Sequence, residues 1–293
     1  MLKKLATLTI PLLTFSNIAL TCDVTGQTGI VEENNLYIST TAKSVSTVTE
    51  EKFNEILDRV DAIYRPIIDE KGKSLEISRN WEDGTVNAYA QQIGSTWKIS
   101  MFGGLARHET ITDDAFALVA CHELGHHLGG APKKAGWWGS SWASNEGQAD
   151  YFGNLKCLRK YMEEDDNIAI IAEMEVDEYA REKCEGNFTN ETEIAMCIRG
   201  AMAGESLGNL FRALRRMETE IHFNTPDENE VTRTNDSHPA PQCRLDTYFA
   251  GALCDKDFND DVSDSDANTG VCSREEGLAT GIRPLCWYKP SDR

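Results

Sequence analysis

Apolar and polar residues alternate along this chain with two distinct periods. From Thr49 to Ile67 the apolar positions recur at i, i+3 and i+4, which predicts an amphipathic helix that Pro66 bends or ends. Three strand-like runs follow at about 75–79, 86–92 and 96–102, punctuated by glycines. Further helices are predicted at about 112–128, 144–161, 165–184, 190–222 and 243–254. This order predicts an α+β fold that is mostly helical, with a small antiparallel sheet.

The stretches between these elements divide the chain into three parts. Residues 1–22 combine a short positive start with an interrupted apolar run and are predicted to be a signal peptide. Residues 23–254 are predicted to form one domain, which starts with an extended arm and includes a loop at 131–143 carrying Trp137, Trp138 and Trp142. Residues 255–293 begin with an acidic run whose spacing does not fit a calcium loop, and they are predicted to be a solvated, disulfide-stapled extension.

Composition and charge exclude some kinds of protein and some kinds of binding partner. The 40% apolar content argues against disorder, and the formal net charge of −19 argues against nucleic acid and anionic membrane surfaces as partners. No stretch after the signal peptide has the length of a membrane span. We therefore expect an exported protein, periplasmic or secreted.

The cysteines point to the same compartment. Of the nine, Cys22 lies at the predicted cleavage site, where lipid attachment is an alternative to a free N-terminus. The other eight form an even set, which predicts disulfides in an exported chain. Cys243 and Cys254 would lie about 16 Å apart on one helix, which excludes a bond between them. The remaining pairings stay open, and no C-x-x-C pair favours a cysteine zinc site.

The sequence His122-Glu123-Leu124-Gly125-His126 is the strongest chemical signal in the chain. Residues i and i+4 share one face of a helix, so His122 and His126 can direct ring nitrogens at one cation, while Glu123 can act on a water bound to it. The pattern predicts a catalytic zinc ion with Glu123 as general base. A histidine pair in an ordinary core is a poor alternative, because buried Glu123 would then need a partner.

A catalytic zinc site needs a third protein ligand. The position six residues after His126 is Pro132, which has no donor, so a third histidine there is excluded. Glu146 opens the next predicted helix, and Asp150 lies one turn later on the same face. We predict that Glu146 binds the metal and that Asp150 orients a ligating histidine. Alone, both acids would be ordinary first-turn residues of a helix.

Taken together, these motifs resemble the zinc metallopeptidases that include the CAAX prenyl proteases and the heat-shock protease HtpX, peptidase family M forty-eight. The resemblance covers about residues 45–254 in consistent order. Its motifs are N-A-x-A at 87–90, a Gly-ended strand, H-E-x-x-H, E-x-x-x-D at 146–150 and a late H-P followed by an arginine. The membrane spans of some members are absent, which makes prenylated peptides a poor substrate.

The resemblance implies roles for further residues. It implies a zincin-like domain in which His238 stabilises the oxyanion or acts as a switch on the zinc, and Arg244 lies near the substrate or the site carboxylates. It also implies that strand 96–102, with Ser100, Met101, Phe102 and Gly103, is an edge strand that borders the cleft and pairs with an extended substrate. The substrates would be unfolded or flexible polypeptides.

The prediction from sequence is thus a metalloendopeptidase with one zinc ion. The alternative is a zinc-stabilised chaperone or binding scaffold with little or latent proteolysis. Glu123→Gln separates them, since it should abolish cleavage and retain the zinc. A third interpretation is an extracellular digestive enzyme rather than a quality-control one, and locating the protein in the periplasm or the medium would separate these two.

Overall fold

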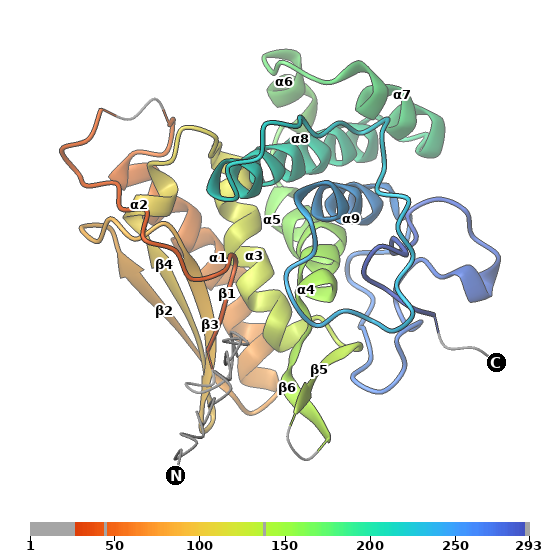
Figure 1. Cartoon of the computed structure of the whole chain (residues 1–293), viewed down its shortest axis with the longest axis horizontal. Coiled ribbons are helices and arrows are strands. Elements are labelled where there is room, and N and C mark those ends of the chain that lie inside the picture. The colour runs from red at the N-terminus through yellow and green to blue at the C-terminus, as the bar shows by residue number, and fades with distance from the viewer. Residues whose placement is uncertain (1–26, 44–45, 137–138, 291–293) are drawn as a thin grey trace, which may run out of the picture.

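The computed structural model describes residues 27–43, 46–136 and 139–290. The predicted signal peptide with Cys22 and the two tryptophans Trp137 and Trp138 lie outside these residues. The described chain is α+β, as predicted: a sheet lies on one side, helices lie on the other, and one helix runs between them (Figure 1). No helix of the described part is long and apolar enough to cross a membrane.

The sheet has four strands and is mixed, where the sequence predicted an antiparallel one. Its order is β1-β3-β4-β2, with β1 antiparallel to β3, β3 antiparallel to β4, and β2 parallel to β4. A tight turn at Gly94, with φ of 60°, joins β3 to β4. The strands are β1 (Gln27–Gly29), β2 (Ser74–Asn80), β3 (Ala88–Ile93) and β4 (Thr96–Phe102).

The predicted edge strand is an interior strand, so that prediction is wrong. β4 pairs along its whole length with β2, from Ser74 opposite Thr96 to Asn80 opposite Phe102, and with β3 on its other side. Ser100 and Met101 therefore have strand neighbours on both sides, and Phe102 is paired with Asn80. Gly103 opens the short helix α2 (Gly103–Ala106), where a Cβ would lie 1.9 Å from Trp81 O.

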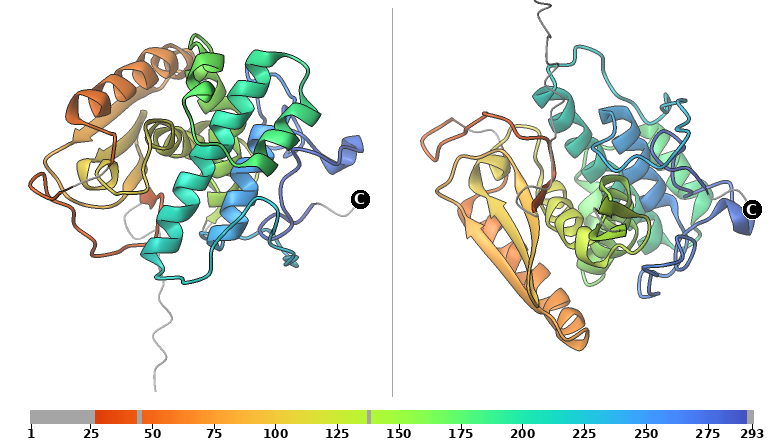
Figure 2. Two further views of the ribbon diagram at one scale, coloured as in Figure 1. Left: turned by 90° about the horizontal axis from the view of Figure 1, so that it is seen from above. Right: turned by 60° about the horizontal axis from the view of Figure 1, so that its bottom comes forward.

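Helix α3 (Asp113–Leu128) is the centre of the molecule. Thr112 caps its first turn by accepting a hydrogen bond from Ala115 N, at the predicted start of the helix. Nearly every side chain of α3 is buried, because it contacts the sheet and helix α1 on one side and α4, η1 and α8 on the other. Figure 2 shows α3 enclosed between the sheet and the helical layer. The H-E-x-x-H residues on this helix are thus held on every side.

The remaining helices match the predicted order but not all of the predicted lengths. α1 continues through Pro66 to Glu70. The predicted helix 165–184 is two helices, and 190–222 ends at Leu214, just before Arg216 with its positive φ. The helices are α1 (Glu50–Glu70), α4 (Glu146–Phe152), the π-helical η1 (Gly153–Leu158), α5 (Arg159–Met162), α6 (Asn167–Ala172), α7 (Glu178–Asn187), α8 (Glu191–Leu214) and α9 (Pro241–Leu253).

The predicted loop at 131–143 contains a hairpin of β5 (Lys133–Gly136) and β6 (Gly139–Ser144). Its second strand leads directly into Asn145, whose side chain caps α4 by accepting from Gln148 N. Trp142 stacks on His127, with ring centroids 4.7 Å apart. The hairpin therefore connects the end of the H-E-x-x-H helix to the helix that carries Glu146.

Four disulfides join the eight predicted cysteines, as expected for an exported chain. They are Cys121–Cys157, Cys184–Cys197, Cys243–Cys286 and Cys254–Cys272. The last two tie the C-terminal extension to the two ends of α9, and the extension includes the short 3-10 turn η2 (Arg274–Glu276). The acidic extension is thus held through Cys272 and Cys286, whose partners are Cys254, directly after α9, and Cys243 within it.

Candidate metal centre

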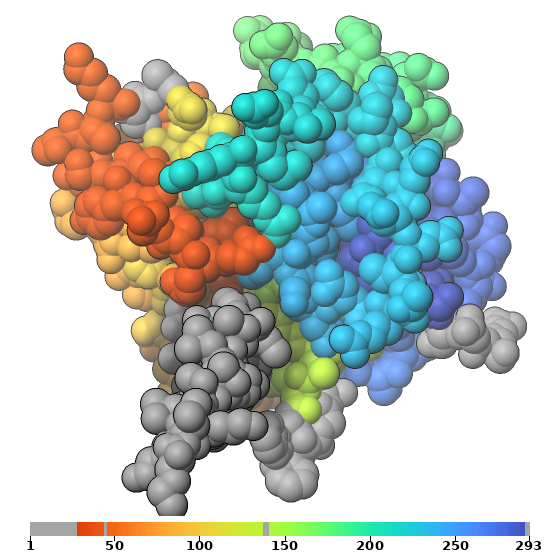
Figure 3. Space-filling model, in the orientation of Figure 1, coloured from red at the N-terminus to blue at the C-terminus, as the bar shows by residue number. Residues whose placement is uncertain are grey.

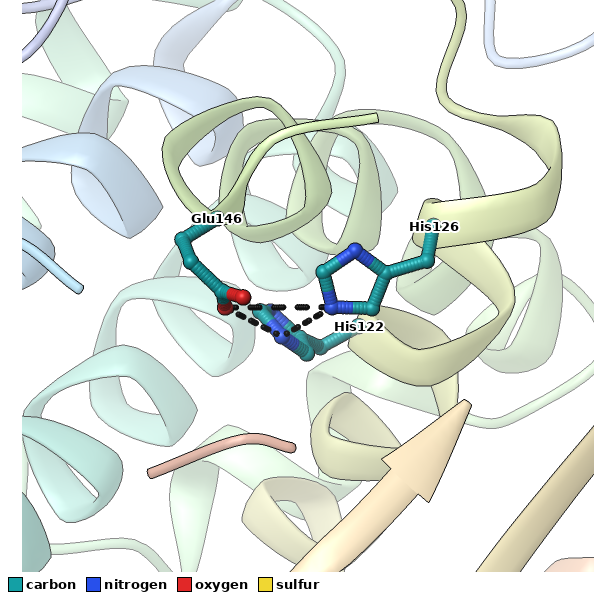
Figure 4. Close-up of side chains that lie close together, drawn as sticks. All are labelled: His122, His126 and Glu146. Atoms are coloured by element: carbon teal, nitrogen blue, oxygen red, sulfur yellow. Dashed lines mark hydrogen bonds and ion pairs between the residues drawn. The ribbon is translucent and has the colours of Figure 1, made fainter. Parts of the chain in front are cut away.

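Three side chains from two buried helices meet at one point (Figure 4). His122 and His126 project from successive turns of α3, and Glu146 is the first residue of α4. All three are fully buried. His122 Nε2 lies 3.1 Å from His126 Nε2, and Glu146 Oε2 lies 3.3 Å and 3.7 Å from these two atoms. The structure therefore brings together the three residues that the sequence predicted as ligands.

These separations fit a tetrahedral zinc ion. Metal–ligand bonds of about 2.1 Å at tetrahedral angles place neighbouring ligand atoms about 3.4 Å apart. The three measured distances, 3.1, 3.3 and 3.7 Å, lie on either side of that value. Gly125 allows α4 to approach α3 this closely, because a Cβ at Gly125 would lie 2.9 Å from Ala149 O. The helix spacing itself thus sets the ligand geometry.

Each histidine presents the correct nitrogen to the centre. His126 Nδ1 donates to Ser144 O at 2.8 Å, which leaves the lone pair of Nε2 for a cation. His122 Nδ1 lies 2.7 Å from Asp150 Oδ1, as the sequence predicted for Asp150. Burial lowers the pKa of His122, but Asp150 and Glu146 outweigh it and raise this pKa to about 9. A metal at Nε2 of His122 would take the place of that proton.

Glu146 and Glu123 have buried carboxylate oxygens without hydrogen-bond partners in the described part of the chain, which a cation could neutralise. Glu146 Oε2, and both carboxylate oxygens of Glu123, are buried and accept no hydrogen bond from the described residues. Burial raises the pKa of Glu146, yet His238, Lys134 and His126 hold it well below its usual range. An ionised, unsatisfied carboxylate oxygen between two ring nitrogens is costly without a cation. The residues present therefore fit a bound zinc ion.

Glu123 is fully buried and interacts electrostatically with His122 and Glu146 of this centre. Burial raises its pKa to about 8, with His122, Lys134 and Arg244 acting in the opposite direction and Glu146 adding to the rise. A divalent cation at the three ligands would favour the ionised form. Its unpartnered oxygens leave it free to accept a proton from a water molecule in the site.

Two further side chains reach Glu146. His238 Nε2 lies 3.3 Å from Glu146 Oε2, which places this loop histidine at the centre, as the resemblance implied. Burial lowers the pKa of His238, so its neutral ring can donate from Nε2. Lys134 of β5 donates to Glu146 Oε1 at 2.7 Å and directs Oε2 toward the histidines. Sequence analysis missed Lys134, because its segment was predicted to be a loop.

Arg244 of α9 holds Asp150 in place. Arg244 Nε donates to Asp150 Oδ2 and Nη2 donates to Oδ1, both at 2.7 Å, and the guanidinium lies over the ring of Phe211 at 3.7 Å. Tyr248, one helical turn after Arg244, donates to the same Oδ1 at 2.5 Å. Tyr248 was not among the predicted residues, although its i+4 spacing from Arg244 was a usable signal.

The C-terminal extension supports the start of α4. The ring of Trp287 is fully buried against Gly147, where an added Cβ would lie 2.2 Å from it. Arg283 donates to Gln148 Oε1 at 3.1 Å. Trp287 of the C-terminal extension thus holds Gly147, the residue after the predicted ligand Glu146, in place. Sequence periodicity could not show this contact.

A disulfide also braces the centre. Cys121 precedes His122 and is bonded to Cys157 of η1, so α3 is covalently tied to the helical segment that follows α4. Two other groupings of acidic and cysteine side chains in the described residues contain only disulfide-bonded cysteines, so they offer no thiolate to a metal.

Comparisons with family models, with curated proteins and with solved structures find no match for this chain. The geometry is therefore the ground for assigning a function. The three candidate ligands converge on one point, and the carboxylate of Glu123 has no hydrogen-bond partner among the described residues. Arg244 donates hydrogen bonds to Asp150 behind them.

Proposed function

We propose that the protein is a zinc-dependent endopeptidase. The observation that carries the proposal is the buried triangle of His122, His126 and Glu146 with unpartnered Glu123 next to it. Two histidines and a carboxylate on neighbouring helices form the ligand set of hydrolytic rather than structural zinc sites, which use four protein ligands. The resemblance to the CAAX prenyl protease and HtpX group leads to the same activity.

The three ligands would hold the ion, which when bound lowers the pKa of a water molecule and polarises the scissile carbonyl. Glu123 accepts the proton of that water and returns it to the departing amine. His238, neutral and 6% exposed, donates a hydrogen bond from Nε2 to the carbonyl oxygen as negative charge develops there. Asp150 keeps the His122 ring in position through Nδ1, and Arg244 keeps Asp150 ionised.

The substrate side of the proposal is an extended polypeptide. Strand β4 is paired on both sides, so an added peptide strand would have to pair at the edge of the sheet, along β1 or β2. Binding through main-chain hydrogen bonds requires an unfolded or flexible target. The four disulfides are consistent with action in an oxidising compartment outside the cytoplasm.

Metal removal and replacement test the proposal. The purified protein should contain one zinc ion per chain, and dialysis against a chelator should abolish cleavage of reduced casein. Stoichiometric zinc should restore it, while magnesium, which prefers six oxygen ligands, should not. If casein is cleaved equally well after the metal content has fallen to zero, the proposal is wrong.

The alternative, a zinc-stabilised binding scaffold, predicts a different pattern. A scaffold would bind one zinc ion and retain reduced casein without producing fragments. Its binding would be the same for the parent and for Glu123→Gln, because that substitution leaves all three ligands in place. Fragments made only by the parent would exclude it.

A further inference from the structure

The chain's own N-terminal strand runs past the candidate metal centre. β1 pairs with the outer side of β3, with Thr28 opposite Ala90 and Gly29 opposite Tyr89. The main chain then continues between the sheet and the loop that carries His238, and Ile30 is fully buried there. In Figure 3 this first described segment, in red, lies on the same face as α8, in teal, and the cyan segment that follows it.

Two side chains that the resemblance placed near the oxyanion or the substrate, His238 and Arg244, bind this segment. His238 Nε2 donates to Gly29 O at 2.7 Å, and Arg244 Nη1 donates to Ile30 O at 2.6 Å. Ile30 N donates to Ala88 O at 3.1 Å. Two consecutive carbonyl groups therefore face the two groups expected to stabilise a bound peptide.

The side chain of Asn87 binds the main chain of the next residue, Val31. Its Oδ1 accepts from Val31 N at 3.4 Å, and its Nδ2 donates to Val31 O at 3.2 Å. Asn87 is the first residue of the N-A-x-A motif, and no other part of the proposed chemistry uses it. The Asn87 amide thus binds both the N–H and the C=O of Val31. Hydrogen bonds of this kind hold a peptide through its main chain, whatever its side chains.

His238 links the Gly29 carbonyl to one of the proposed metal ligands. The same His238 Nε2 that donates to Gly29 O at 2.7 Å lies 3.3 Å from Glu146 Oε2. The space at this position favours glycine, because a Cβ on Gly29 would lie in tight contact, 3.0 Å from Asn87 Oδ1 and from the Tyr89 ring. The residue after it is an aliphatic side chain with no exposed surface.

We propose that the Gly29–Ile30 peptide bond is a substrate of the protein's own site, and that its hydrolysis produces a mature chain beginning at Ile30. This inference rests on the proposed endopeptidase function and names its first substrate. It also defines the class of peptide the site accepts: glycine before the cleaved bond and a β-branched aliphatic residue after it.

The step consumes one water molecule. The water oxygen bonds to the carbonyl carbon of Gly29, the C–N bond to Ile30 breaks, and the proton accepted by Glu123 passes to the Ile30 nitrogen. The second proton of the water leaves the new Gly29 carboxyl group for the Ile30 amine, so the products are a fragment that ends in the Gly29 carboxylate and a chain that begins with the Ile30 ammonium. Val31 remains bound to Asn87, so the new N-terminus stays at the site while the residues before it lose their covalent link.

The test follows the N-terminus by mass. The full chain is expressed without its first 22 residues, purified with a chelator, and given zinc in the absence of any other protein. Denaturing mass spectrometry should show conversion to residues 30–293 with a rate per chain that does not change with concentration. Glu123→Gln should stay uncut. The second Thr-Gly-Ile sequence, Thr280–Ile282, is an internal control and should stay intact.

The outcomes separate this inference from the proposed function. Cleavage of casein by a parent that keeps its Gly29–Ile30 bond would overturn the inference and leave the endopeptidase in place. Equal cleavage of parent and Glu123→Gln at residue 29 would overturn the inference, because another protease would be responsible. Failure to cleave either casein or the chain itself would overturn both.

A second readout needs no activity. In metal-free Glu123→Gln protein, hydrogen exchange should be slow at the Ile30 and Val31 amides and fast at the exposed residues 32 and 33. Asn87→Ala should speed exchange at Val31 at least tenfold and have less effect at Ile30, which donates to Ala88 O instead. Exchange at residues 30 and 31 as fast as at 32 and 33 would show that the segment is not held at the site.

Discussion

Replacing Asp150 with asparagine separates the stability of the centre from its affinity for metal. Asp150 is fully buried and receives two hydrogen bonds from Arg244, one from Tyr248 and one from His122. Burial raises the pKa of Asp150, but Arg244 and His122 lower it to about 2, so the carboxylate is ionised at neutral pH. Asp150→Asn therefore leaves the Arg244 cation, itself 2% exposed, without its counterion.

The expected cost has two parts. Breaking a buried ion pair from one side costs about 3–5 kcal/mol of folding free energy. Loss of the carboxylate that orients a ligating histidine lowers metal affinity about 10–100-fold. The double variant Asp150→Asn/Arg244→Met removes both charges, so it should recover much of the stability while zinc affinity stays low, because His122 Nδ1 still lacks its carboxylate.

The assay measures both quantities on the same proteins. Denaturant unfolding of the metal-free, disulfide-intact forms gives the stability, and competition with a chromophoric chelator gives the zinc affinity. Asp114→Asn is the matched control, since Asp114 pairs at 2.6 Å with Arg199, away from the centre. It should lower stability and leave zinc affinity unchanged. If the Asp150→Asn/Arg244→Met variant regains parental zinc affinity, or if Asp150→Asn costs less than about 1 kcal/mol, the reasoning fails.

Two further predictions concern the supports of the centre, and a third concerns Asp246 of α9. Replacing Cys121 and Cys157 by serine opens a link that spans 36 residues and should cost about 4 kcal/mol, with weaker zinc binding. Gly147→Ala should lower both stability and zinc affinity, because its methyl group meets the buried indole of the tail. Burial raises the pKa of Asp246 to about 6 from 3.8, so its ionised form is less favourable in the folded state. Ionisation of Asp246 should therefore lower the free energy of unfolding as pH rises from 3.8 through about 6. The loss should be about 2 kcal/mol between about pH 4 and about pH 8.

Each of these has its own control. Replacing Cys184 and Cys197, which join α7 to α8, by serine should lower the free energy of unfolding by about 3 kcal/mol. It should leave zinc binding unchanged. Gly186→Ala, in open space on α7, should be neutral or stabilising by up to about 1 kcal/mol. Asp246→Asn should remove about 2 kcal/mol of the pH dependence in unfolding experiments. Equal effects for Gly147→Ala and Gly186→Ala, or an unchanged pH slope in Asp246→Asn, would contradict these accounts.

Local sequence signals located the candidate centre because its parts are short-range patterns. The i, i+4 spacing of His122 and His126 and the capped start of α4 place three side chains on two helix faces. Their convergence needed only that these helices pack together, which glycine at position 125 permits. Asp150 followed from the same helix face as Glu146.

Long-range pairing is what the sequence could not show. The parallel pairing of β2 with β4 and the pairing of β1 with β3 depend on tertiary contacts, so β4 was wrongly predicted as an edge strand. Lys134 lies in a hairpin whose residues have no clear alternation, and Trp287 reaches α4 from the far end of the chain. Residues 27–31 carried no signal of their own beyond an extended, Gly-containing segment.

The most direct test of the central claim is a parallel measurement of zinc content and casein cleavage for the parent and Glu123→Gln. The substituted amide keeps the shape of the side chain and leaves His122, His126 and Glu146 in place, but it cannot accept the proton of a water molecule. We predict one zinc ion per chain in both proteins and fragments from the parent alone. Cleavage by both proteins at the same rate, or a parent without zinc that still cleaves, would contradict the account.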